Sequence, residues 1–158
     1  MKYLISYKIF ENIEDINECF YDLVDMGFDN IKDITKEESD RLKRSNDLHR
    51  LDIPIPKKAF ELVKTKNTTN VSGRISGDFT KDSIEMPTSI LDSSSHTSKG
   101  LDRRKLNEYE EKLCSTLIDS IRLMSNIYLT EYNRGDYVIG FNNTILDGNK
   151  IFILIRFY

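Results

Sequence analysis

Residues 137–157 read YVIGFNNTILDGNKIFILIRF, and this stretch decides the fold class. Tyr137, Ile139 and Phe141 occupy alternate positions, as in a strand with one buried face. Asp147-Gly148-Asn149 is typical of a tight turn. The residues after that turn are apolar at consecutive positions, which indicates a strand covered on both faces and therefore central in its sheet. We expect a hairpin of residues 137–145 and 150–157.

A long amphipathic helix is predicted before this hairpin, over residues 103–129. Its apolar residues recur every three or four positions, which places them on one stripe of a helix. The stripe consists of Leu106, Tyr109, Leu113, Leu117, Ile121, Met124 and Tyr128. We expect this helix to be the central one and to pack on the sheet.

The N-terminal part of the chain predicts a strand followed by a helix. Residues 2–10 alternate like a half-buried strand, and residues 13–26 have helical spacing that ends at Gly27. Phe28 and Ile31 begin a short second strand. With the hairpin, this order predicts one α+β domain over residues 1–158, with an antiparallel or mixed sheet, helices packed on one face and one long central helix.

The next segments are less regular. Thr35 to Glu38 has the form of a capping box and predicts a mostly polar helix. Residues 49–55 alternate like an edge strand that Pro54 restricts. Pro56 suits the first turn of a short helix that carries Ala59, Phe60 and Val63.

Residues 66–100 follow neither the helical nor the strand period of apolar residues. They are rich in Ser, Thr, Asn, Gly and Asp, with isolated apolar residues. We expect an exposed polar excursion with few core contacts, either functional or disordered. Residues 71–79 within it could form a small ribbon or an irregular loop.

Composition limits the classes of function. The net charge is −3 over 158 residues, which argues against a general nucleic-acid coat because such proteins carry a basic excess. No apolar run is long enough to cross a membrane, and the N-terminus lacks the pattern of a signal peptide, so we expect a cytoplasmic protein with two free cysteines. One alanine, no Trp and abundant Ile, Asn and Lys suggest an AT-rich genome, such as that of a low-GC bacterium, a phage or another virus.

One cluster of residues predicts a binding site for an anion or an anionic partner. Hydroxyls and basic side chains gather where the long helix is expected to begin, and amides at a helix N-terminus bind phosphate or carboxylate. The cluster consists of Ser95, His96, Lys99, Arg103, Arg104 and Lys105. The alternative is that Asp102 caps the helix and the cations are an ordinary solvated face.

The sequence lacks the usual catalytic patterns. It has no Gly-rich phosphate loop, no Cys/His metal set and no nucleophile elbow, so we expect no metal and no cofactor. Two functions stay open. The first is a non-enzymatic accessory protein, of the kind carried by phages or mobile elements, that binds and blocks a protein or a protein–nucleic acid complex. The second is binding or hydrolysis of a phosphorylated ligand, a nucleotide or RNA, at the basic cluster, with His96 as acid or base and Glu108 or Glu111 as accompanying carboxylates.

Overall fold

The computed structural model describes residues 17–44, 53–65, 73–92, 102–142 and 150–158. In these residues the chain is α+β, with a seven-stranded antiparallel sheet in the order β1-β2-β7-β6-β3-β4-β5. The strands are β1 Asn30–Asp33, β2 Lys58–Lys64, β3 Gly73–Phe79, β4 Ser89–Leu91, β5 Arg103–Lys105, β6 Gly135–Asn142 and β7 Lys150–Phe157. The helices are α2 Tyr21–Asp25, α3 Thr35–Arg44 and α4 Glu108–Tyr128. Thus the predicted α+β class, with an antiparallel sheet and one long helix, is confirmed, although not all helices lie on one face as predicted.

The C-terminal hairpin forms as predicted. β6 and β7 pair in register from Gly135 opposite Phe157 to Asn142 opposite Lys150. β7 lies between β2 and β6, so it has a strand neighbour on each side. Its side chains are buried on both faces: Ile153 belongs to the main core and Leu154 to a smaller cluster on the opposite face. This placement explains the apolar run.

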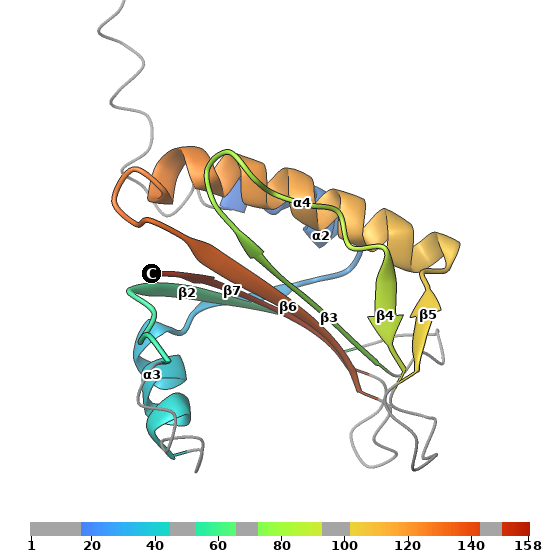
Figure 1. The fold of residues 1–158 in the computed structure, drawn as a ribbon, viewed down its shortest axis with the longest axis horizontal. Helices are drawn as coiled ribbons and strands as arrows, with labels where there is room; N and C mark the ends of the chain where they lie inside the picture. Colours follow the sequence, from blue (N-terminus) through green and yellow to red (C-terminus); the bar gives the residue numbers. More distant parts are fainter. Residues whose placement is uncertain (1–16, 45–52, 66–72, 93–101, 143–149) are drawn as a thin grey trace, which may run out of the picture.

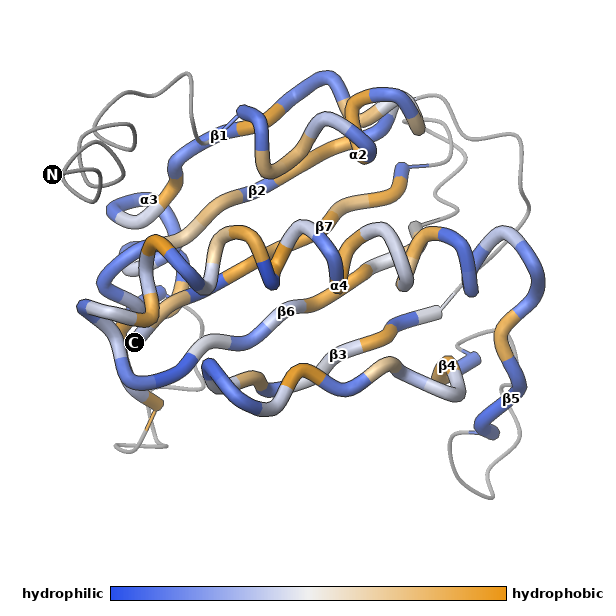
Figure 2. Tube along the Cα trace, turned by 90° about the horizontal axis from the view of Figure 1, so that it is seen from above, coloured by the Kyte–Doolittle hydropathy of each residue, from blue (hydrophilic) through white to orange (hydrophobic). Residues whose placement is uncertain are grey.

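The long helix packs on the sheet through the predicted stripe. Leu113, Leu117, Ile121 and Met124 are fully buried in the main core with the inward side chains of the strands. Figure 1 shows α4 running along one face of the sheet, with α2 on the same face. Seen from above in Figure 2, α4 lies over the middle strands and α2 lies beside it towards β1 and β2. No helix in the described ranges is long and apolar enough to cross a membrane.

The N-terminal predictions are tested only in part. The strand at residues 2–10 and the start of the helix at residues 13–26 lie outside the described residues. The end of that helix is confirmed: α2 stops at Asp25, and Gly27 follows with a φ of 93°. A left-handed backbone of this kind costs glycine little, which is why the helix ends there. The short strand after it is β1.

Helix α3 forms, but Thr35 does not act as its capping residue. Thr35 is the first helical residue, and its hydroxyl oxygen accepts a hydrogen bond from the Ala59 amide at 3.0 Å. Glu38 is 2% exposed and forms an ion pair with Arg156 of β7, with 3.1 Å between Oε1 and Nε. Arg156 also bonds Asp136 Oδ2 at 3.0 Å. This polar helix is therefore held to the second face of the sheet by buried charge, and it lies across the sheet from α4 in Figure 1.

The short helix predicted after Pro56 is wrong, because residues 58–64 form strand β2. This strand pairs with β1 on one side and β7 on the other. Phe60 and Leu62 belong to the main core, whereas Ala59 is buried on the second face. Apolar residues on both faces of an interior strand imitate helical spacing. Of the predicted edge strand, residues 53–55 are not in a strand and residues 49–52 lie outside the described residues.

The predicted excursion at residues 66–100 is wrong at residues 73–79 and 89–91, which form β3 and β4, whereas residues 80–88 lie outside the named strands and are mostly exposed. β3 pairs with β6 from Gly73 to Phe79, and Ile75, Phe79 and Ile90 are buried in the core. The strand period was hidden because Gly77 occupies an inward position. A Cβ on Gly77 would lie 2.7 Å from the hydroxyl oxygen of Tyr137, so only glycine fits beside that ring. Residues 66–72 and 93–100 lie outside the described residues.

Candidate functional site

The predicted basic cluster does not lie at a helix N-terminus. Arg103, Arg104 and Lys105 form strand β5, and α4 begins after them at Glu108. Asn107 caps the helix instead, with its side chain accepting from the Glu110 amide at 2.9 Å while Glu110 accepts from the Asn107 amide at 2.9 Å. Asp102 is therefore not the cap either. Ser95, His96 and Lys99 lie outside the described residues.

The charges in the first turn of α4 explain why the basic residues lie before the helix and not at its N-terminus. The first turn of α4 carries Glu108, Glu110 and Glu111. Acidic residues are favoured at this end by the helix dipole, and the capping box satisfies amides that a ligand would otherwise bind. The helix terminus in the structure thus follows the ordinary preference for acidic residues in the first turn.

Arg104 has a structural partner. Its guanidinium donates to Oε2 and Oε1 of Glu110 at 2.8 and 2.6 Å, and Glu110 is fully buried. These hydrogen bonds raise the pKa of Arg104 above its usual value. The side chain therefore joins the edge of the sheet to the long helix, which removes Arg104 from the candidate binding residues.

Arg103 and Lys105 lie on the opposite face of β5 from Arg104, because successive side chains alternate in a strand. Leu91 of β4 pairs with Arg103 on one side and with Arg74 of β3 on the other. Directly opposed residues share a face, so Arg74, Leu91 and Arg103 form one row across three strands. Lys105 lies on that face too, opposite Ser89. We call Arg74, Arg103 and Lys105 the cationic strip.

The cationic strip is exposed and lacks ion-pair partners within the described part of the chain. Arg74, Arg103 and Lys105 are all exposed, and none of the ion pairs among described side chains includes them. Neighbouring strands are spaced about 4.8 Å apart, so the backbones at Arg74 and Arg103 lie roughly 10 Å apart. Two guanidinium groups at this spacing can hold anionic groups of one partner together.

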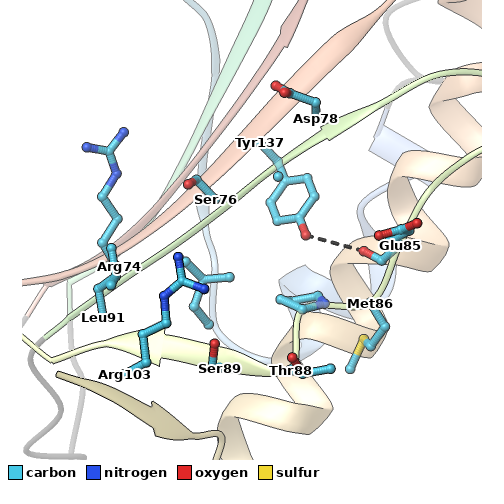
Figure 3. A pocket seen from close by; sticks show the side chains of 13 residues that line it. Arg74, Ser76, Asp78, Glu85, Met86, Thr88, Ser89, Leu91, Arg103 and Tyr137 are labelled. Carbon is cyan, nitrogen blue, oxygen red and sulfur yellow. Dashed lines mark hydrogen bonds between the residues drawn. The ribbon is translucent and has the colours of Figure 1, made fainter. Parts of the chain in front are cut away.

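A pocket of about 460 Å³ opens beside the strip, between β3 and the segment of residues 85–89. Figure 3 shows Arg74 and Arg103 on one side of it and Asp78 and Glu85 on the other. The polar lining also includes Ser76, Thr88, Ser89 and Tyr137. The pocket thus carries positive and negative side chains at opposite ends, with hydroxyl groups between them.

Tyr137 of β6 forms the inner wall of this pocket. Its ring crosses Gly77 of β3, and its hydroxyl donates to the backbone carbonyl of Glu85 at 3.4 Å. Burial raises the pKa of Tyr137 to about 12, so the hydroxyl keeps its proton at neutral pH. This hydrogen bond holds the segment that contains Glu85 against Tyr137 and not against the edge of β3.

Sequence reasoning found Arg103 and Lys105 but missed Arg74. The available signal was the alternation of Arg74, Ser76 and Asp78 with Ile75 and Phe79. Both histidines lie outside the described residues, so the pairing of His96 with Glu108 or Glu111 stays untested. These two glutamates line a second cavity of about 580 Å³ that also includes Met86 and Leu106.

The described residues contain no group of three His, Cys, Asp or Glu side chains that could hold a metal ion. No protein-family model matches the chain, and neither the curated proteins nor the solved structures with which it was compared gave a match.

Proposed function

We propose that this chain is a non-enzymatic binding protein that blocks a macromolecular partner, and that the end of the sheet formed by β3, β4 and β5 is the contact surface. The observation that carries the proposal is the row of Arg74, Leu91 and Arg103 across three paired strands. The partner is a protein, alone or in complex with nucleic acid, that presents anionic groups. An accessory role in a phage or mobile element, inside a host cell, belongs to the same proposal and rests on composition.

The chemistry of the strip suits a protein partner. Arginine is enriched at protein interfaces, where its planar guanidinium binds carboxylates through paired hydrogen bonds. The backbones that carry the two exposed arginines are already paired in one sheet, so only their side chains lose freedom on binding. Leu91 between them supplies an apolar contact, which is the usual companion of charged groups in an interface.

The test is co-purification from the native host with a charge-reversed variant. Arg74→Glu/Arg103→Glu should lose the partner that the parent protein retains, and raising ionic strength should weaken retention by the parent. The matched control is Lys36→Glu/Lys43→Glu on α3. Each replacement changes the charge by two, so both double variants have a net charge of −7 in place of −3. Equal retention by both variants would contradict the proposal.

A phosphorylated ligand is the second candidate. It is favoured because the hydroxyls of Ser76, Thr88 and Ser89 share the pocket wall with Arg74 and Arg103, and phosphate oxygens accept from both kinds of group. Calorimetric titration with a nucleoside triphosphate and with inorganic phosphate tests it. Saturable binding that Arg74→Glu/Arg103→Glu abolishes and Lys36→Glu/Lys43→Glu retains would favour this candidate.

A further inference from the structure

One edge of β3 is open along most of its length. β3 pairs with β6 at all seven residues from Gly73 to Phe79, but it pairs with β4 at Arg74 alone. In an antiparallel ladder, every second residue points its N–H and C=O groups towards each neighbouring strand. Among the described residues, the β4-side edge of β3 therefore has no strand partner over residues 75–79.

The chain beside this edge is held out of the plane of the sheet. After β3, Thr80 and Ser83 form a tight turn through two backbone hydrogen bonds. Ile84 then packs against the main core, and the Glu85 carbonyl accepts from Tyr137, whose ring lies on the α4 side of β3. Figure 1 shows this segment arching towards α4 before it descends into β4.

Proline adds a second reason why the segment does not close on β3. Continuing the β3–β4 register from Arg74 opposite Leu91 would place Thr88 opposite Gly77 and Pro87 opposite Asp78. Proline has no backbone N–H, so residue 87 cannot donate to the ladder. The pocket between β3 and residues 85–89 is the space that results.

The side chains along the open edge follow a charge pattern. Arg74, Ser76 and Asp78 are exposed on the same face, with a cation at one end and a carboxylate at the other. Arg103 lies in one row with Arg74, and Asp78 and Glu85 both line the pocket. An added strand would therefore meet positive charge at one end and negative charge at the other.

We propose that the open edge of β3 binds an extended segment of a partner protein as an added strand. Because Arg74 already faces Leu91 of β4, the segment has an acidic side chain opposite Ser76, diagonal to Arg74, and a basic side chain two residues away opposite Asp78. Backbone hydrogen bonds to residues 75–79 supply affinity, and the two charged pairs select the sequence. This inference rests on the proposed function, because it specifies how the protein partner is held.

The experiment is a titration of the full chain, labelled with ¹⁵N, with a synthetic peptide. The peptide has about ten residues, mainly Thr and Val, with one Glu and one Lys two residues apart. We expect the amide signals of residues 75–79 to shift and to gain protection from hydrogen exchange. A second peptide with the same side chains but N-methyl groups on alternate backbone nitrogens should not bind, because methylation removes the donors of one strand edge.

Protein variants test the side-chain part. Arg74→Glu should weaken binding of the first peptide roughly fivefold, because a diagonal pair of opposite charges becomes a like-charge pair. Lys43→Glu on α3 should leave the affinity unchanged. Equal binding of the N-methylated peptide, or no shift at residues 75–79 at millimolar peptide, would overturn strand addition. If partner capture still depends on Arg74 and Arg103 in that case, the proposed function stands and the added strand alone is wrong.

Discussion

Arg104 and Glu110 connect the last strand of the sheet to the first turn of the long helix through two hydrogen bonds of 2.8 and 2.6 Å. The same carboxylate accepts from the Asn107 amide, so one buried side chain both caps α4 and ties it to β5. The pair explains why a run of basic residues can precede a helix without lying on it.

Glu110→Ala should lower the free energy of unfolding by about 3 kcal/mol. Removing one member of a buried ion pair usually costs about 3–5 kcal/mol, and the Arg104 side chain, 33% exposed, recovers part of this through hydration. Urea unfolding followed by circular dichroism measures the loss. Glu108→Ala, in the same turn but exposed, is the control and should cost less than about 1 kcal/mol. Equal losses in the two variants would contradict the structural role of the pair.

Leu117→Ala should lower the free energy of unfolding by about 2–5 kcal/mol, because Leu117 is fully buried between α4 and the sheet. Leu123→Ala on the same helix provides the matched comparison. Leu123 is 53% exposed, so we expect a change within about 0.5 kcal/mol. An unchanged melting temperature for Leu117→Ala would place α4 off the sheet.

Arg156→Ala should cost about 3 kcal/mol, because the buried Glu38 loses its partner from β7 and keeps its ion pair with Arg41, whose side chain is 54% exposed. Asp136 loses the same guanidinium, and burial already raises the pKa of that carboxyl against the opposing effect of Arg156. Arg122→Ala, which breaks the exposed pair with Asp119, should cost about 0–1 kcal/mol. Chemical denaturation measures the free energy of unfolding of both variants. A loss for Arg156→Ala as small as that for Arg122→Ala would show that the Glu38 network adds no stability.

Tyr137→Phe should make the protein less sensitive to alkali. The ordinary pKa of tyrosine is 10.0, and burial raises that of Tyr137 to about 12. Below pH 10 both states keep the proton, whereas between pH 10 and about 12 only the unfolded state loses it. The stability linked to this proton is therefore lost as pH rises through that window, by about 3 kcal/mol in total.

The measurement for Tyr137 is urea unfolding at pH 8 and pH 11. The parent should lose more stability between these values than Tyr137→Phe. The Cys114 thiol and the Tyr128 hydroxyl, whose pKa values burial also raises to about 12, are present in both proteins. Tyr21→Phe, which removes a hydroxyl from a side chain that is 60% exposed, should behave like the parent. The same alkaline loss in all three proteins would show that Tyr137 is not desolvated.

The sequence by itself determined the elements in which buried side chains recur with the period of a helix or a strand. The stripe of α4, the alternation of β6 and the apolar run of β7 report a helix on a sheet, a strand with one buried face and a central strand. Gly27 marks the end of α2 because its left-handed backbone is a local property. Each of these features needs only neighbours along the chain.

Only the tertiary structure decided which strands lie side by side. β3 joins β6 across more than fifty residues of sequence, and Gly77 is required there only because Tyr137 of β6 crosses it. β2 was predicted as a helix because its side chains are buried on both faces, Phe60 and Leu62 in the main core and Ala59 on the second face. The candidate site has the same origin: Arg74 and Arg103 share a row because β4 lies between their strands. Backbone hydrogen bonds between strands are nearly independent of side-chain identity, so the sequence of one strand does not specify its neighbour.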